Sequence, residues 1–486
     1  AAGVRVFLNG APVEVEVVRD KLVKDITYQG GEPDLAIGYR FRDAGFKGGK
    51  VDDFRVFNRC LTPIEMAEVA GRDGLRVAWK ANLDSLAAGQ RDALLDYYVA
   101  NVYPPAKQFL ADLSALRRQQ SRIINPIPEI MAMEELSRPK PAYILKRGAY
   151  DAHGESVSAG TPKVLPPFPA GAPRNRLGLA QWLLSPENPL MARVTVNRAW
   201  QLMFGKGIVE TSDNFGAQGA VPTHPKLLDW LARDFMTSGW NYRALLKKIA
   251  MSATYRQSSK ASPDLLARDP DNKWLARGRA RRLTAEMLRD EALAVSGLLD
   301  EKIGGPSVRP YQPPGLWEIA MGNPKYEQGH GDDLHRRSLY TFWKRTVPPP
   351  TMIAFDAPER NVCVVRRQST STPLQSLALL NDTQIVEAAR FVSERMFKQG
   401  GSTSDDRIAW AFRLVTSRHP APKELTVLQR LFREQRDLFA GDQQAAARLL
   451  AVGETPNDPG ISPADLAAGT VLAEALLNHD EAGMRR

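Results

Sequence analysis

Helix signals dominate residues 174–480 of this 486-residue chain. Leu228, Leu231 and Phe235 have the spacing of one helix face, and Gly239 after them is a residue type that ends helices. The pattern predicts a mainly α-helical domain with a few short strands, interrupted by an irregular, Pro/Gly-rich zone at residues 304–350. Helices are predicted to begin near the cap residues Thr223, Asn241, Thr284 and Asp382.

Residues 1–71 favour β-strands instead. The Val-rich residues 4–8 and 13–17 flank Asn9-Gly10, a pair typical of a tight hairpin because both residues accept positive φ. Further strands are predicted at residues 35–38 and 51–57, and Thr62 with Glu65 predicts a capping box that opens a short helix.

Two stretches join these regions. Residues 72–136 are predicted to be mostly helical, with an amphipathic helix over residues 107–124 that Pro126 ends. Residues 137–173 are rich in Pro, Gly and Ser, and predict an extended connector with one strand-like piece at residues 143–145.

Composition and charge narrow the function classes. The net charge is +10, and half of this excess lies in residues 273–367, which favours polyanionic partners or a soluble surface laced with ion pairs. Cys60 and Cys363 are the two cysteines, so a disulfide framework is excluded. No C-x-x-C-H motif occurs, so we expect no cofactor in this chain. No run of about 18 apolar residues occurs, so no membrane span is expected. The chain opens at Ala1 without a signal peptide, and we expect it to be truncated.

The first seventy residues resemble the end of a laminin-G-like, concanavalin-type jelly roll. The resemblance implies a partial antiparallel β-sandwich with about half of its strands absent, so residues 1–71 are expected to be a fragment. The motifs that carry it are VFLNG at 6–10, IG at 37–38, GFKG at 45–48, VDDFRVFNR at 51–59 and LT at 61–62.

The second part of the chain resembles the planctomycete-specific domain one family, over roughly residues 130–480. The motifs are NPL at 188–190, RVTVNRAW at 193–200, FGKGIV at 204–209, DNFG at 213–216, PTHPKLLDWL at 222–231, GW at 239–240, SATYR at 252–256, RRSLY at 336–340, FDAP at 355–358 and TPLQSL at 372–377.

This resemblance indicates which proteins the chain is related to, but it implies no particular reaction. Members often carry an upstream cytochrome-c-like domain, which implies that haem belongs to a missing upstream region and not to this chain. Their exported character implies a periplasmic or cell-envelope location, with other envelope proteins as partners.

Basic residues provide the first candidate site. The guanidinium fork suits sulfate, carboxylate or phosphate, and aromatic faces suit sugar rings or bases. The segment at residues 337–344 also has the pattern of a half-buried strand whose charges cap its ends. We expect an anionic glycan rather than nucleic acid, because no nucleic-acid-binding module is recognisable. The candidates are Arg336, Arg337, Tyr340, Trp343, Lys344 and Arg345, with Arg277, Arg279, Arg281 and Arg282 as a second group.

Two polar groups are candidates for a metal and for acid–base chemistry. His330, Asp332 and His335, with Asp333 between them, offer imidazole and carboxylate ligands, although a solvated polar loop has the same composition. Asp213 and His224 could form a general acid–base pair, or begin a turn and a helix. In both cases we favour the structural interpretation.

Two further features are interpreted as structural. Cys363 has arginine neighbours that could activate its thiol, but the valines beside it favour a buried strand. Residues 205–207, Gly-Lys-Gly, lack the spacing of a phosphate loop and predict a turn.

Three hypotheses on function follow. The first is a non-catalytic binding or scaffold protein for an anionic polysaccharide of the cell envelope. The second is an uncharacterised hydrolase whose site combines residues 304–350 with Asp213 and His224. The third is an accessory to electron transfer, implied only by the upstream domain of relatives.

Overall fold

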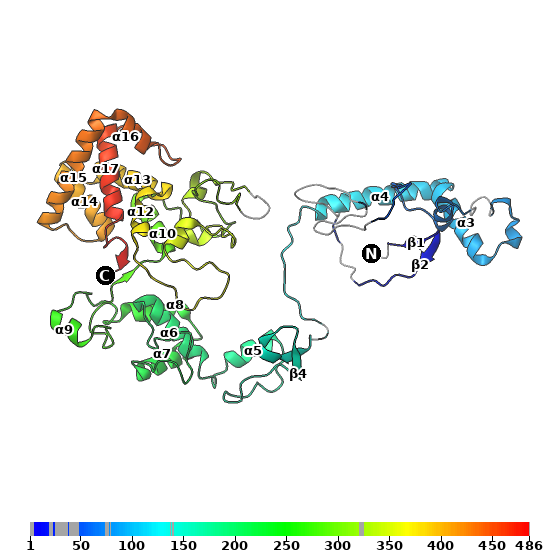
Figure 1. Cartoon of the computed structure of the whole chain (residues 1–486), viewed down its shortest axis with the longest axis horizontal. Coiled ribbons are helices and arrows are strands. Elements are labelled where there is room, and N and C mark those ends of the chain that lie inside the picture. Colours follow the sequence, from blue (N-terminus) through cyan, green and yellow to red (C-terminus); the bar gives the residue numbers. More distant parts are fainter. Residues whose placement is uncertain are drawn as a thin grey trace. The chain divides into compact units, whose positions relative to one another are not determined.

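The computed structural model describes residues 4–18, 23–24, 37, 48–72, 77, 79–136, 138, 140–319 and 325–485. The chain forms two compact units, residues 1–140 and 141–486 (Figure 1). In the part that the structure describes, the chain is mostly helical with a few short strands, as the sequence predicts. No helix in that part combines the length and the apolar character needed to span a bilayer.

The first unit contains the hairpin that Asn9-Gly10 predicts. Strands β1 (Val6–Leu8) and β2 (Ala11–Val13) pair antiparallel, and both turn residues have positive φ, 51° and 77°. Residues 51–57 form no strand, which corrects that prediction, and residues 35–38 lie outside the described residues except for Ile37. The jelly-roll assignment stays a prediction.

Helices and a 3₁₀ turn follow the hairpin in the described part of this unit. Helix α1 (Pro63–Val69) begins as predicted, because the Glu65 carboxylate accepts a hydrogen bond of 2.8 Å from the Thr62 N–H. Gly71, beyond its end, has a φ of 73°. The 3₁₀ turn η1 (Leu83–Ser85) and the helices α3 (Ala88–Asn101) and α4 (Pro104–Ile124) follow, and α4 contains the predicted amphipathic segment.

The second unit opens with a hairpin and a short helix. Strands β3 (Ala142–Leu145) and β4 (His153–Val157) pair antiparallel, so the predicted strand-like piece is confirmed. Between them lies the 3₁₀ turn η2 (Lys146–Gly148). Helix α5 (Arg176–Leu183) begins at Asn175, whose side chain accepts hydrogen bonds from two backbone N–H groups of the first turn.

A first hydrophobic cluster joins α6 (Met191–Phe204), α7 (Pro225–Thr237) and α8 (Tyr242–Met251). Asn197, which is fully buried, fixes the loop after α6, because its side chain both accepts from Val209 N at 2.8 Å and donates to Val209 O at 3.0 Å. Gly205 ends α6 with a φ of 79°, so residues 205–207 form the predicted turn.

Three of the four predicted helix starts are confirmed. The side chains of Asn241, Thr284 and Asp382 each accept a hydrogen bond from a first-turn N–H group. Helix α7 is the exception, because His224 rather than Thr223 is its cap residue. The Thr223 N–H bonds instead to the Ile208 carbonyl at 2.9 Å, so Thr223 belongs to the preceding loop.

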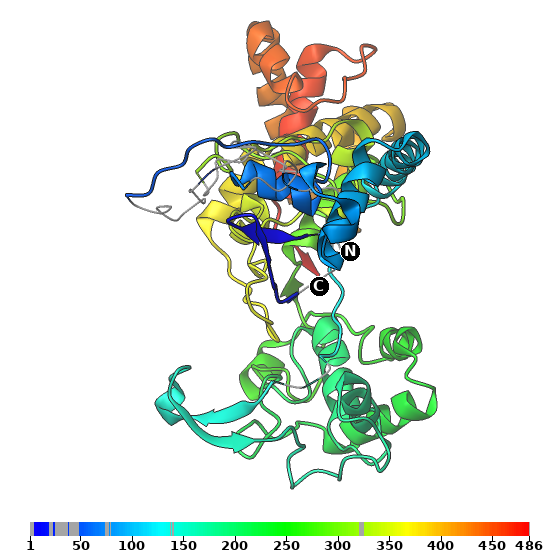
Figure 2. The same cartoon turned by 90° about the vertical axis from the view of Figure 1, so that its right-hand side faces the viewer.

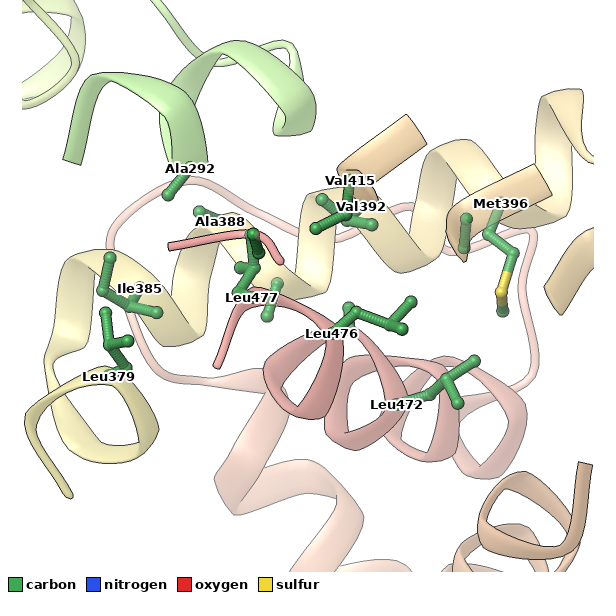
Figure 3. Packing of buried hydrophobic residues seen from close by; sticks show 14 of the residues in the cluster. Ala292, Leu379, Ile385, Ala388, Val392, Met396, Val415, Leu472, Leu476 and Leu477 are labelled. Atoms are coloured by element: carbon green, nitrogen blue, oxygen red, sulfur yellow. The ribbon is translucent and has the colours of Figure 1, made fainter. Parts of the chain in front are cut away.

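A second, larger cluster is built around α13 and α17 (Figure 3). Leu466, Ala468 and Leu472 of α17 are fully buried, and a helix with buried residues around most of its surface belongs in the centre of a core. The helices of this cluster are α10 (Ala285–Ser296), α11 (Pro350–Ala354), α12 (Pro373–Asn381), α13 (Thr383–Gln399), α14 (Ser404–Thr416), α15 (Pro422–Gly441), α16 (Gln443–Leu450) and α17 (Pro463–Leu477).

A two-stranded ribbon lies between the two clusters. After α9 (Pro263–Arg268), strand β5 (Arg281–Arg282) pairs antiparallel with β6 (Met484–Arg485). Both views show the two arrows between the helices of the first cluster and those of the second (Figures 1 and 2). The ribbon therefore brings together segments that lie about two hundred residues apart in the sequence.

The irregular zone is held by a buried arginine. Arg289 of α10 donates to the carbonyl oxygens of Leu334 and Arg336 at 2.7 and 2.8 Å, and burial lowers its pKa to about 10. The zone contains two 3₁₀ turns, η3 (Gly331–Leu334) and η4 (Ser338–Tyr340). The half-buried strand that residues 337–344 suggested is therefore a turn followed by a single parallel bridge from Thr341 to Val308.

Candidate functional site

An open groove of about 970 Å³ has five arginines among its twenty lining residues. The ribbon strand β5 forms one wall, the loop between α11 and α12 forms a second, and residues at and after the end of α17 form a third. The lining comprises Gln201, Gly205, Arg279, Ala280, Arg281, Arg282, Arg366, Arg367, Gln368, Ser369, Thr370, Ser371, Ser376, Leu379, Leu477, Asn478, His479, Asp480, Gly483 and Met484.

The first wall holds its arginines partly buried. The Arg281 Nε atom is buried and has no hydrogen-bond partner among the described residues, and burial lowers the pKa of this guanidinium. Arg282 donates to the Thr370 carbonyl at 3.1 Å and lies over the Phe355 ring at 5.5 Å.

The second wall is an exposed loop pinned at Thr370. The Asp356 carboxylate accepts from the Thr370 N–H at 2.7 Å and from its hydroxyl at 2.9 Å. Gln375, fully buried in α12, donates to the same hydroxyl oxygen at 3.1 Å and to the Ala354 carbonyl at 2.9 Å. These bonds fix the loop that carries Arg366 and Arg367.

The charge of the groove is strongly positive. Five arginines line it, and Asp480 is the one carboxylate among the described lining residues. Outside the lining, Glu286 of α10 pairs with Arg367 at 2.7 Å. Burial opposes ionisation of Glu286, but the bond and charge of Arg367, together with hydrogen bonds from its own N–H and from Thr284, outweigh burial and lower the pKa of the carboxyl. Ser369, Thr370 and Ser371 add hydroxyl groups, whereas the described lining has no Trp, Tyr or Phe for stacking.

The structure divides the predicted basic residues. Arg279, Arg281 and Arg282 come together in the groove. Arg277 does not, because it is buried and donates to the Pro270 carbonyl at 3.0 Å. The role predicted for Arg336 needs correction, since its side chain is buried and donates to the carbonyls of residues 302, 304 and 306.

The other members of the Arg336 group are dispersed. The Tyr340 ring lies 3.8 Å from the Arg336 guanidinium, the Trp343 ring lies 4.3 Å from Arg360, and Lys344 lies over Trp317 at 4.4 Å. Arg337 and Arg345 are exposed. None of the group lines the groove, and the faces of its rings already contact cations of the protein.

The His330–His335 group separates into two hydrogen-bonded pairs with different partners. His335 Nε2 lies 3.1 Å from a Glu387 oxygen, and His330 Nδ1 lies 2.7 Å from a Glu454 oxygen. Asp332 and Asp333 are exposed. In the part of the chain that the structure describes, no group of three or more His, Cys, Asp or Glu side chains could hold a metal ion.

The His335–Glu387 pair serves the packing of a loop. The Glu387 side chain has no exposed surface, that of His335 is 8% exposed, and Glu387 also accepts from the N–H groups of Glu454 and Thr455 at 3.0 and 2.9 Å. Burial opposes ionisation of Glu387, but these bonds and the one to His335 lower the pKa of its carboxyl. A substrate could not reach this pair.

The remaining candidates lie apart from the groove. His224 Nδ1 lies 3.0 Å from the Thr223 hydroxyl, and Asp213 is exposed. Among the described residues, no hydrogen bond or ion pair joins Asp213 to His224. Cys363 is exposed, which corrects its prediction as a buried strand residue. Cys363 lies on the exposed loop between Asp356 and Thr370, and this loop forms no strand.

Sequence reasoning missed part of the groove. From the sequence we considered Arg366 and Arg367 only as neighbours of Cys363 and did not predict them as ligand-binding residues. We did not single out His479 or Asp480. These segments meet through the ribbon and the Thr370 bonds, which leave no local pattern in the sequence.

Fold and groove together define a mainly helical protein with an arginine-lined, open cleft. The chain belongs to the PSD1 family, described as "Protein of unknown function (DUF1553)", whose model matches residues 175–432. This range is just over half of the chain and confirms the resemblance carried by the motifs. It contains all five groove arginines, whereas the wall formed by residues 477–484 lies beyond it. No curated protein and no solved structure matches the chain.

Proposed function

We propose that this protein binds an anionic polysaccharide in the arginine-lined groove and does so without catalysis. The observation that carries the proposal is the ratio of charges in the groove, five arginines to one carboxylate. Guanidinium groups bind sulfate and carboxylate through paired hydrogen bonds, and the hydroxyls of the 369–371 loop add neutral donors.

The shape of the groove favours a polymer over a small metabolite. About 970 Å³ of open volume with polar walls suits several linked units that lie along a surface, whereas small-molecule sites are enclosed and mostly apolar. Because the described lining has no Trp, Tyr or Phe ring, charge and hydrogen bonds rather than stacking would mainly hold the ligand. Single-stranded nucleic acid would leave its bases without stacking partners.

The lining favours binding over hydrolysis. Glycoside hydrolases generally use two carboxylates that flank the bond to be cleaved, and Asp480 is the one carboxylate in the described lining. We therefore place the hydrolase hypothesis second. The family resemblance supports, as part of the same proposal, an exported protein of the cell envelope with haem confined to a separate upstream domain.

The proposal is tested by affinity for heparin, an accessible sulfated polysaccharide, at low salt. The double variant Arg279→Gln/Arg366→Gln removes one exposed charge from each of two walls. We expect its affinity to fall about tenfold, because each exposed ion pair is worth up to about 1 kcal/mol. Binding should also weaken as salt rises.

The matched control is Arg233→Gln/Arg243→Gln on helices α7 and α8. It removes the same charge from exposed positions that do not line the groove, and should leave affinity within a factor of two or three. If the intact protein is not retained by heparin at low salt, or both double variants lose affinity equally, the groove is not a polyanion site.

A further inference from the structure

A second open cleft, of about 780 Å³, borders on the ribbon of β5 and β6. It shares Ala280 and Met484 with the arginine-lined groove, but none of the five groove arginines lines it. The end of α14 and the loop after α8 form further walls, and α10 contributes Glu291. The cleft is therefore a candidate site of its own, with a different charge from that of the groove.

Glu291 brings a carboxylate without a partner to this cleft. Among the described residues, no hydrogen bond or ion pair involves this carboxylate, and its oxygens are not among the buried polar atoms that lack a partner. The oxygens therefore keep accessible surface, and the side chain lines the cleft. Burial raises the pKa of this carboxyl to about 7. A partly buried carboxylate gains more from an added cation than a fully hydrated one does.

The other charged groups of the cleft do not supply that cation. Arg418 lies 2.5 Å from an oxygen of Glu481 and 2.7 Å from one of Glu424, so two carboxylates already neutralise it. Lys260 is exposed, and burial is the one cause that shifts the pKa of Glu291. The Glu291 carboxylate is therefore available to a cation from outside the chain.

Apolar side chains line the same cleft. Val415 and Ala482 are each 4% exposed, and Leu283 and Met484 are partly buried. A carboxylate in a partly apolar cleft suits a cation that is carried on an apolar chain, because the chain can cover the wall while the charged end meets the carboxylate. A metal ion would need several more oxygen ligands than one unpaired carboxylate provides.

We propose that this cleft binds a primary ammonium group carried on a short apolar chain, with the Glu291 carboxylate as its counter-ion. The ammonium donates hydrogen bonds to the carboxylate oxygens, and the chain lies against the apolar lining. The lysine side chain of a peptide and a free alkylamine share this chemistry. The inference goes beyond the proposed function, because it does not depend on the groove.

The experiment compares two pairs of probes on the unaltered protein by ligand-observed NMR titration at pH 8. One pair is the end-blocked tripeptide glycyl-lysyl-glycine and the same peptide with norleucine in place of lysine. The other pair is n-pentylammonium and n-pentanol. At this pH the carboxyl is mostly ionised and the amines stay charged. We expect the charged member of at least one pair to bind about tenfold more tightly than its neutral match.

The variant Glu291→Gln assigns this preference to the cleft. It removes the charge with little change in shape, so both members of each pair should bind the variant equally. The matched control is Glu434→Gln, which removes an exposed carboxylate on α15 that does not line the cleft, and the preference should persist there. A cooperative thermal transition with a midpoint close to that of the parent protein shows that each variant is folded.

Proton release gives a second readout on the unaltered protein. Since the pKa of Glu291 is about 7, about half of these carboxyls carry a proton at pH 7. A bound ammonium favours the ionised form, so binding should release up to about half a proton per ligand. Calorimetric titration in two buffers with different ionisation enthalpies measures this number, and it decides alone if Glu291→Gln does not fold.

The outcomes also distinguish the two sources of the ammonium. A preference for the lysine peptide alone identifies a lysine of a partner protein as the ligand, whereas a preference for n-pentylammonium shows a site open to free amines. Equal binding within both pairs overturns the proposal, as does a preference that Glu291→Gln retains or binding without proton release. Because none of these measurements uses heparin, a failure here leaves the proposed function to be judged by its own test.

Discussion

Gly469 of α17 lies so close to Ser393 of α13 that a Cβ atom on Gly469 would come 2.1 Å from the Ser393 hydroxyl oxygen. The same hydroxyl donates to the Leu466 carbonyl of α17 at 3.2 Å. This hydrogen bond links the two helices, and the hydroxyl also limits how closely they can approach. Both residues are buried at the centre of the larger cluster. The missing side chain of Gly469 thus sets the spacing between the two central helices.

Replacement of this glycine tests that spacing. Gly469→Ala should lower the free energy of unfolding by about 2 to 4 kcal/mol, because the helices must move apart or Ser393 must leave its bond. Urea denaturation measures the loss. Gly441→Ala, at the end of α15 with no atom within 4 Å of the new Cβ, should be close to neutral. Equal stability of the two variants would show that α13 and α17 are not packed this closely.

A buried carboxyl should make stability depend on pH. Glu474 of α17 is 9% exposed, and burial raises its pKa to about 7. The folded state therefore holds a proton that the unfolded state loses near pH 4.5, so the stability contributed by this group falls as pH rises from about 4.5 to 7.

Glu474→Gln removes this dependence. We expect the variant to exceed the parent protein by about 2 kcal/mol at pH 8 and to match it near pH 4.5. Thermal unfolding across the pH range measures the difference. Glu434→Gln, an exposed substitution on α15, should show no such trend, and a constant difference for Glu474→Gln at every pH would contradict the assignment.

The buried carboxylate of Glu387 on α13 should not tolerate the loss of its charge. Glu387→Gln leaves His335 and the loop N–H groups of residues 454 and 455 with a weaker acceptor inside the protein. We expect a loss of about 3 kcal/mol in urea denaturation, the usual cost of breaking a buried charged network. An unchanged midpoint would mean that the loop does not depend on this carboxylate.

Glu286 should limit the affinity of the groove. It occupies Arg367 at 2.7 Å, so Glu286→Gln frees one groove arginine and should raise heparin affinity several-fold. Asp229→Asn makes the same change in net charge, but it frees Arg193, which does not line the groove, and should have little effect. Equal gains in both variants would attribute the effect to overall charge alone.

Local features of the fold were predictable from the sequence because their causes are local. Asn9-Gly10 needs positive φ at two successive residues, and Asn241, Thr284 and Asp382 cap helices through their own side chains. The family resemblance rests on motifs that now have structural roles, such as Asn197 bonding Val209 and Gln375 bonding Thr370.

The groove was only partly predictable, because its walls meet through distant contacts. Arg279, Arg281 and Arg282 stood out as a basic group, whereas Arg336 looked equivalent and is instead buried under backbone carbonyls. The residue type alone does not distinguish an arginine that lines a cleft from one that donates to the backbone carbonyls of a loop. Helix α17 gave no periodic signal because apolar residues lie all around it and do not form a single stripe.

The ribbon of β5 and β6 has a consequence for how this cleft comes into being. Because one of its strands is supplied by residues 484–485, a peptide copied from residues 277–290 would carry three of the arginines without the surface that orients them. The proposed binding surface therefore depends on a contact between distant parts of the chain, and we expect it to be lost when either strand of the ribbon detaches.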